Sequence, residues 1–152
     1  VFDIVKLADE VLELEHPLSK ERQISLISAY KTDKQLMVKA DRKRITEVLT
    51  NLVVNGVKYG KTNGFVKVGF YDFDDKIMVE VSDNGIGIDK KDLSRIFERF
   101  FRVDKSRSRE QGGTGLGLSI VKHIIEAHNQ TINVQSVLNE GTTFTFTLEK
   151  AR

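Results

Sequence analysis

The order of the apolar strand-like segments constrains the fold of this chain more than any other feature. The segments "FVKVGFYD" (65–72) and "KIMVEVSD" (76–83) read as strands joined through a short turn, and "TINVQSV" (131–137) and "TTFTFTLE" (142–149) form a second such pair. Strands that follow one another directly favour antiparallel pairing, whereas strands that alternate with helices favour a doubly wound parallel sheet. The sequence therefore predicts a mostly antiparallel sheet with helices on one side.

Three further segments place apolar residues at the spacing of a helix. They are residues 2–18, where Asp3 can cap the first turn, residues 41–60, where Asp41 can cap the helix and Gly60 can end it, and residues 117–128. A short helix is predicted around 90–97, and two short strands at 22–30 and 35–40 flank the turn-like segment 31–34. The result is a mixed α/β layout of about three main helices and six strands.

Composition excludes several classes of protein. The 152 residues fit one domain that can bury its own core. No Cys is present, which excludes disulfides and thiolate metal sites. The 24 basic residues nearly balance the 22 acidic ones, so the net charge of +2 does not indicate binding to nucleic acid. No apolar run approaches the roughly 20 residues of a membrane helix, and no signal-peptide pattern opens the chain.

The segment "QGGTGLGLSI" (111–120) is rich in glycine and leads into a helix. Its glycines do not have the spacing of a dinucleotide-binding turn, and Leu118 stands where a P-loop needs Lys. A glycine loop before a helix N-terminus favours phosphate, although a tight loop packed against the sheet explains the same glycines. The preceding basic segment 99–110 suits an anion site or a solvated flexible loop, and composition alone favours the flexible loop.

A second glycine cluster follows a strand in "VSDNGIGID" (81–89). The strand ends at Asp83, and Gly85 and Gly87 let the chain bend back beneath it. An ionised Asp only accepts hydrogen bonds, so it can receive an exocyclic amine such as that of adenine. A calcium loop fits poorly, because glycines stand where that pattern requires Asp or Asn. An ordinary Asp-Asn-Gly surface turn is the alternative.

The helix predicted at 41–60 carries a polar group of side chains on an otherwise apolar pattern. Asn51 and Asn55 are four residues apart and share a face, with Lys58 and Tyr59 about one turn further on. Amide oxygens suit Mg²⁺, which keeps several waters and bridges phosphates, while Lys58 offers a charge and Tyr59 a ring for stacking. A polar stripe on an amphipathic helix is the alternative.

Taken in order, these motifs closely resemble the catalytic, ATP-binding domain of sensor histidine kinases of two-component systems. The wider GHKL group of Bergerat-type folds also includes gyrase, Hsp90 and MutL ATPase domains. The matching segments are the N box (50–60), the first glycine box (83–88), the F box (96–104), the second glycine box (112–129) and a Gly-Thr element (140–146). The F box and the sequence after the last glycines resemble histidine kinases rather than their gyrase-like relatives.

The resemblance implies an α+β fold, described as an α/β sandwich. Its mixed, mostly antiparallel sheet of about five to six strands is covered on one face by three helices. Residues 1–152 are expected to form one catalytic ATP-binding domain with an ATP lid at about 99–114. One departure is Gly56, where the family usually has Ala; it weakens the helix by up to about 1 kcal/mol and is expected to touch none of the proposed ligand residues.

The resemblance also implies roles for individual residues in binding ATP and Mg²⁺. Asn55 is expected to be the main metal ligand with Asn51 beside it, Lys58 to meet phosphate and Tyr59 to pack on adenine. Asp83 is expected to accept a hydrogen bond from the adenine amine, and Gly85 and Gly87 are expected to leave room for the base. The other expected nucleotide contacts are Ile88, Arg102 (helped by Lys105 or Arg107), Gly113, Thr114, Gly115, Leu116, Gly117, Leu118 and either Thr142 or Thr143.

Catalysis is expected to depend on Asn51, Asn55, Lys58 and Arg102, through positioning and charge neutralisation. In such kinases the γ-phosphoryl group goes to a His in a motif like His-Glu-x-x-x-Pro on a separate dimerisation domain. His16 stands directly before Pro17, which is the wrong spacing, so His16, His123 and His128 are interpreted as surface or packing residues. Phe97, Phe100 and Phe101 resemble a lid hinge, although the bare sequence favours core packing.

The expected partners are therefore ATP, the dimerisation and phosphotransfer domain of the same parent protein, and a response regulator reached through that domain. The fragment is expected to be cytoplasmic and monomeric, without contact to nucleic acid or membrane, and its parent to be a membrane-anchored bacterial kinase. Two alternatives stay open: a related nucleotide-binding regulatory module or anti-sigma-type serine kinase, and an interaction domain that binds no nucleotide.

Overall fold

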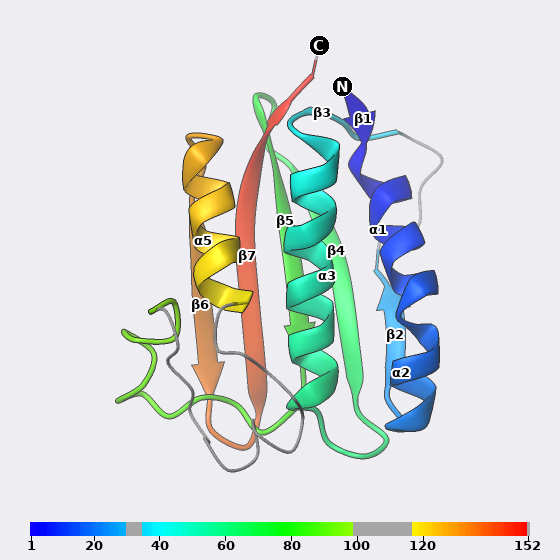
Figure 1. Ribbon diagram of the computed structural model, residues 1–152, viewed down its shortest axis with the longest axis vertical. Helices are drawn as coiled ribbons and strands as arrows, with labels where there is room; N and C mark the ends of the chain where they lie inside the picture. The colour runs from blue at the N-terminus through cyan, green and yellow to red at the C-terminus, as the bar shows by residue number, and fades with distance from the viewer. Residues whose placement is uncertain (30–34, 99–116, 152) are drawn as a thin grey trace.

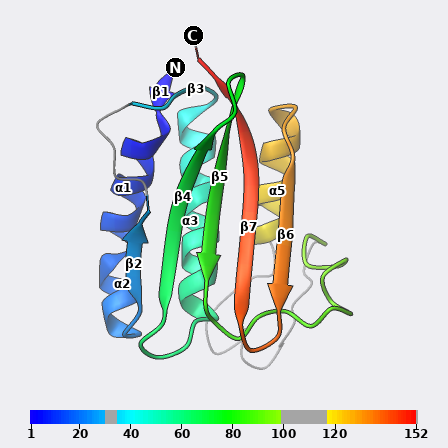
Figure 2. The ribbon, with the colours of Figure 1, turned by 180° about the vertical axis from the view of Figure 1, so that it is seen from behind.

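A computed structural model of the protein describes residues 1–29, 35–98 and 117–151. Its helices lie on one face of a single sheet, as Figure 1 shows from the helix side. Turning the molecule brings the strands to the front and leaves the helices behind them (Figure 2). Within the described ranges, the second face of the sheet carries no helix. The predicted two-layer, one-sided arrangement is confirmed.

The sheet has seven strands in the order β1-β3-β7-β5-β4-β2, with β6 also paired to β7. The strands are β1 (Phe2–Asp3), β2 (Ser25–Ser28), β3 (Met37–Lys39), β4 (Phe65–Asp72), β5 (Lys76–Asp83), β6 (Ile132–Val137) and β7 (Gly141–Lys150). All pairs are antiparallel except β2 with β4, which makes the sheet mixed. The long hairpin of β4 and β5 has the bounds that the sequence predicts.

The inward face of the sheet is built from rows of apolar side chains. Val81 of β5 pairs with Phe144 of β7, and Phe144 pairs with Val134 of β6. Because successive side chains of a strand point to opposite faces, these alternate positions all face the helices. Val81 and Phe144 belong to the buried core cluster, and Val134 packs against it. The next row toward the end of the strands is polar, and it is described with the site below.

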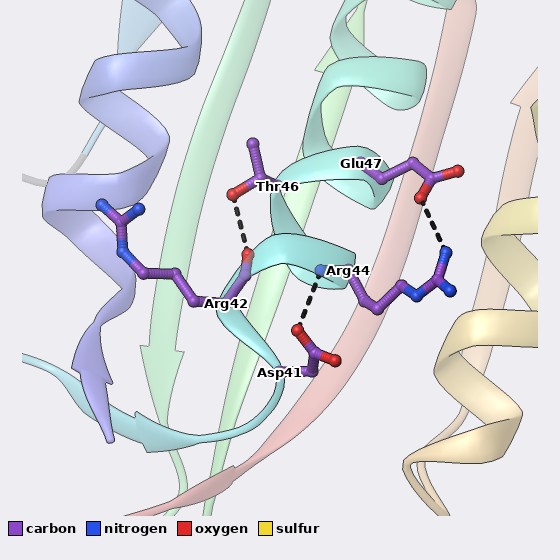
Figure 3. A network of polar contacts seen from close by, with 5 residues as sticks. All are labelled: Asp41, Arg42, Arg44, Thr46 and Glu47. Atoms are coloured by element: carbon purple, nitrogen blue, oxygen red, sulfur yellow. Dashed lines mark hydrogen bonds and ion pairs between the residues drawn. The ribbon is translucent and has the colours of Figure 1, made fainter.

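The helices are α1 (Ile4–Leu14), α2 (His16–Glu21), α3 (Arg42–Lys58) and α5 (Gly117–Ala127). The predicted N-caps are confirmed, because Asp3 accepts a hydrogen bond from the Val5 N–H at 3.0 Å and Asp41 accepts one from the Arg44 N–H at 3.3 Å. Figure 3 shows the first turn of α3 with the Asp41 cap. No helix in the described ranges is long and apolar enough to cross a membrane.

Some elements differ from the sequence predictions. The helix predicted at 2–18 breaks at Glu15, because Pro17 cannot continue a helix and instead stands in the first turn of α2. The helix predicted around 90–97 is instead a run of turns, in which the Asp92 and Arg95 N–H groups each bond to the carbonyl three residues earlier. The strands β2 and β3 are neighbours in the chain but do not pair, and β4, β5 and β7 stand between them in the strand order.

Candidate functional site

A row of three polar side chains lies across the end of β5, β7 and β6. Asp83 pairs with Thr142, and Thr142 pairs with Ser136, one step beyond the apolar row of Val81 and Phe144. By the alternation of the strands these three side chains face the helices. We call Asp83, Thr142 and Ser136 the polar row. At the C-terminal end of β5, the inward face of the sheet therefore changes from apolar core residues to hydrogen-bonding side chains.

The Asp83 carboxyl is the ionisable group of the polar row, and its pKa is shifted. Its Oδ1 accepts a hydrogen bond from the Gly85 N–H at 2.8 Å. Burial raises the pKa of Asp83 from 3.8 to about 6, although hydrogen bonds from the backbone N–H groups of Gly85 and Thr142 oppose the shift. Above that pH the ionised carboxylate is a hydrogen-bond acceptor that water covers poorly, which suits a ligand carrying an N–H donor.

The structure distinguishes the two threonines between which the sequence left the choice open. Thr142 is only 6% exposed and lies opposite Asp83 on the helix side. Thr143 pairs with Ser82 on the other face of the sheet, away from the polar row. Of the pair, only Thr142 is placed beside the Asp83 carboxyl.

The turn after Asp83 packs against protein backbone on both sides. The Ile86 N–H donates to the Tyr59 carbonyl at 3.0 Å, which ties the turn to the end of α3. A Cβ on Gly85 would lie 2.3 Å from that same carbonyl oxygen. Gly87 has a φ of 71°, and a Cβ there would lie 2.2 Å from the Val137 carbonyl oxygen. Both glycines are therefore required by the close approach of the chain to itself.

The amide face of α3 lies next to the first residue of α5. Asn51 and Asn55 are both half-buried, and a Cβ on Gly117 would lie 3.5 Å from the Asn51 Oδ1. The start of α5, the C-terminal end of α3 and the end of β5 all lie at the same end of the molecule (Figure 1). At the end of α3, the Arg22 guanidinium donates to the Lys58 carbonyl at 3.0 Å, which suits the negative end of a helix dipole.

Several of the predicted site residues lie outside the described ranges. They are Arg102, Gly113, Thr114, Gly115 and Leu116, together with Phe100, Phe101, Lys105, Arg107 and the predicted lid at 99–114. Leu118 is described and packs against the core cluster. Phe97 meets the edge of the Phe144 ring with a centroid separation of 6.2 Å, which supports the core-packing interpretation of that residue.

The candidate metal ligands among the described side chains are amides. Among these residues no group of three or more His, Cys, Asp or Glu is arranged to hold a metal ion. The side chains of Asn51 and Asn55 offer neutral amide oxygens instead. Such a pair suits Mg²⁺, which takes few protein ligands and completes its shell with water and phosphate oxygens.

The sequence analysis did not predict two residues that contribute hydrogen bonds to the candidate site. The Ser136 hydroxyl receives the Ile88 N–H at 2.7 Å and lies 2.7 Å from the Thr142 hydroxyl. The Asn84 Oδ1 accepts the Phe65 N–H at 2.8 Å and so fixes the start of β4. Ser136 is half-buried at an inward position of its strand, and the strand alternation alone would have indicated a polar group facing the helices there.

The chain resembles known proteins over most of its length. Residues 40–152 match the model of the family described as histidine kinase-, DNA gyrase B-, and HSP90-like ATPase. The sensor histidine kinase WalK of Bacillus subtilis (strain 168) is 41% identical over 133 residues, which cover 86% of this chain and 22% of WalK.

Solved structures agree with the sequence comparison. The catalytic domain of the histidine kinase ThkA superposes with a TM-score of 0.82 at 34% identity, covering 98% of this chain and 93% of that domain. A second structure holds ThkA in complex with the response regulator protein TrrA, and it matches with a TM-score of 0.79 at 30% identity, over 99% of this chain and 41% of ThkA.

Proposed function

The chain belongs to the histidine kinase-, DNA gyrase B-, and HSP90-like ATPase family, and from this we propose that it binds Mg²⁺-ATP and acts as the catalytic domain of a two-component sensor histidine kinase. One observation carries the proposal. The polar row, the amide face of α3 and the start of α5 meet at one end of the fold. The relatives named above are histidine kinases, which does not favour a regulatory module or a serine kinase.

At the base end of the proposed site, the ionised Asp83 accepts the exocyclic amine of adenine. Thr142 supports this contact from the neighbouring strand, since it lies directly opposite Asp83. Tyr59 packs on the base from the end of α3, next to the turn that its carbonyl holds in place. The raised pKa of Asp83 fits this role, because the carboxylate is poorly solvated without a ligand.

At the phosphate end, Asn55 is the proposed Mg²⁺ ligand, with Asn51 beside it. The bound Mg²⁺ supplies charge neutralisation for the phosphate oxygens. Lys58 contacts phosphate from the last turn of α3. Gly117 opens α5, and the positive end of the helix dipole there favours an anion. Arg102 and the loop residues Gly113, Thr114, Gly115 and Leu116 complete the proposed contacts by resemblance to the family.

The chain spans 22% of WalK, so the activity of the whole protein goes beyond this domain. We propose that the γ-phosphoryl group passes to a His on a separate dimerisation domain of the same parent. His128 is unsuited as acceptor here, because its Nδ1 bonds to the Ile124 carbonyl at 2.8 Å and its Nε2 accepts the Asp41 N–H at 3.1 Å. The ThkA complex with TrrA supports a response regulator as the next partner.

Two measurements test the proposal. Calorimetric titration with ATP, with and without Mg²⁺, is expected to show saturable binding that depends on the metal. Mixing the chain with the parent's helical dimerisation domain and ATP is expected to give an acid-labile, base-stable phosphate on that domain, as phosphohistidine does. Acid-stable phosphate would indicate a serine kinase instead, and absence of ATP binding would reject the proposal as a whole.

A further inference from the structure

A groove lies between the hairpin of β6 and β7 and the run of turns that follows β5. It has a volume of about 490 Å³ and is lined mostly by aliphatic side chains, those of Ile88, Leu93, Val137 and Leu138. Val137 is 57% exposed and Leu138 is 51% exposed, so the described residues leave this part of the lining open to water. Exposed apolar surface gathered in one groove indicates a place where a partner binds.

The rim of the groove carries positive charge. Lys90 lines the groove, Lys91 follows it, and both residues are exposed. Asp89 is engaged in its own turn, because its Oδ1 accepts the Lys91 N–H at 3.2 Å. Neither lysine forms an ion pair with another described residue. The side chain that suits this groove is therefore an apolar one with a carboxylate beside it.

The chain itself carries a side chain of this kind where α1 ends. Leu14 is the last residue of α1 and is 73% exposed. Glu13, directly before it, is exposed and forms no ion pair with a described residue. The chain breaks at Glu15 before α2 begins, so no further turn of α1 covers Leu14. Leu14 and Glu13 together are the complement of the groove and its lysines.

We propose that the groove binds Leu14 of a second copy of this chain, with Glu13 of that copy beside Lys90. The end of β6 and the helix α1 lie on opposite sides of the molecule (Figures 1 and 2). A contact between two different surfaces is heterologous, so it joins copies head to tail. The inference is independent of the proposed function, because Leu14, Val137 and Leu138 are not among the proposed nucleotide contacts.

The contact involves one side chain and one groove, so the interface is small and the association is weak. We expect a Kd on the order of 1 mM, which leaves dilute chains monomeric and joins copies that are held close together. Sedimentation velocity at chain concentrations from about 0.1 to 2 mM is expected to show a mean mass that rises with concentration.

Substitution of either surface tests the contact. Leu14→Ser and Leu138→Ser are each expected to weaken the association about tenfold, because each removes one half of the apolar contact. Both positions are exposed, so the fold is expected to be kept. Phe73→Ser is the matched control, since Phe73 is an apolar residue that is 57% exposed and belongs to neither surface, and it should leave the association unchanged.

Mixing the two variants is the decisive experiment. The Leu14→Ser chain keeps an intact groove, and the Leu138→Ser chain keeps an intact Leu14, so the mixture is expected to form pairs with the affinity of the wild type. The pairs should grow no further, because their two remaining surfaces are the substituted ones. An isotope-labelled Leu14→Ser chain, titrated with the unlabelled partner variant, should show shifted resonances at the groove. Restored binding also shows that both variants are folded.

The charges give a second, independent test. Lys90→Glu is expected to weaken the association roughly threefold, and adding Glu13→Lys to the same chain should restore it, because the opposite charges then meet again across the contact. A wild-type chain that stays monomeric at about 2 mM would overturn the inference. So would a mixture of the two serine variants that associates no better than either alone. Neither result affects ATP binding, which is titrated separately on the same chain.

Discussion

At the scale of single residues, Asp83 carries the clearest conflict between folding and function. Its pKa of about 6 means that the folded chain holds the proton more tightly than the unfolded chain, where the pKa is near 3.8. Between these two values the folded state binds more protons, so the contribution of Asp83 to stability falls as the pH rises through this window and stays low above it. At neutral pH the carboxylate therefore opposes folding.

The variant Asp83→Asn removes this opposing charge and keeps an oxygen that can accept the Gly85 N–H. We expect it to be at least as stable as the wild type at pH 7.5, and the stability difference between the two to shrink as the pH falls toward 4. Urea denaturation at several pH values measures this difference, in which the other carboxyl groups cancel. A variant clearly less stable than the wild type at pH 7.5 would contradict the role of burial.

The proposed role of the same carboxyl predicts that ATP binding depends on pH. Because the proposed contact needs an ionised acceptor, protonation of Asp83 below about pH 6 should weaken ATP binding, by up to tenfold for each pH unit below the pKa. Calorimetric titrations between pH 5 and pH 8 measure this profile, within the range that general stability allows. In Asp83→Asn the affinity should be low throughout and should lose this pH dependence. An identical profile in the two proteins would exclude Asp83 as the titrating group.

At the scale of elements, the contact of α3 with β4 explains Gly56. A Cβ at this position would lie 2.9 Å from the Cγ2 of Val66, a buried β-branched side chain with little freedom to move. Gly56→Ala gains about 1 kcal/mol of helix propensity but overpacks this contact at a cost of about 1–3 kcal/mol. We expect a net loss of about 1 kcal/mol in the free energy of unfolding, measured by urea denaturation.

The matched control for Gly56 is the same change in a Val66→Ala background. With the valine methyl groups gone, the steric cost disappears and only the gain in helix propensity remains, so Gly56→Ala should become stabilising there. The coupling between the two substitutions measures the contact. Gly56→Ala that stabilises the chain with Val66 present would show that the helix and strand can separate without cost.

A second contact between elements joins the end of α5 to the start of α3. His128 Nε2 accepts the Asp41 N–H while its Nδ1 bonds to the Ile124 carbonyl, so one imidazole links the α3 cap to α5. We expect His128→Ala to lower the free energy of unfolding by about 1 kcal/mol. His123→Ala, at an exposed position on α5, is the control and should change the free energy of unfolding by less than about 0.5 kcal/mol. Equal losses of stability in the two variants would show that the contacts of His128 do not stabilise the fold.

At the scale of the whole molecule, local patterns in the sequence predicted local structure well. The strands β4 and β5 and the caps Asp3 and Asp41 follow from alternation and from side chains that bond within their own turn. The pairing of strands that are far apart in the sequence was harder to predict. Nothing near β2 in the sequence indicates that it runs parallel to β4, and Ser136 gains its role only through register with β7. The ordered motifs predicted which segments contribute to the candidate site, whereas the hydrogen bonds of Ser136 with Ile88 and Thr142 are visible only in the structure.

The proposed binding of Mg²⁺-ATP also has a consequence for the whole fold, because a ligand that binds only the folded state stabilises it. At a ligand concentration 100 times Kd the gain is about 2.7 kcal/mol, which corresponds to a rise in Tm of roughly 5–10 °C for a domain of this size. In Asn55→Ala, we expect the part of this rise that depends on Mg²⁺ to be lost, while the Tm without nucleotide changes little, because Asn55 is only half-buried.

Thermal unfolding with ATP and Mg²⁺, and with ATP and a chelator, measures the metal-dependent part of the shift. Asn133→Ala is the matched control, since Asn133 is an exposed Asn on β6, outside the helix-facing polar row, and should keep the full shift. Of Asn55 and Asn133, only Asn55 lies on the proposed metal face of α3, so of these two substitutions only Asn55→Ala should uncouple Mg²⁺ from stability. A metal-dependent shift in Asn55→Ala equal to that of the wild type would mean that the metal is held by other residues.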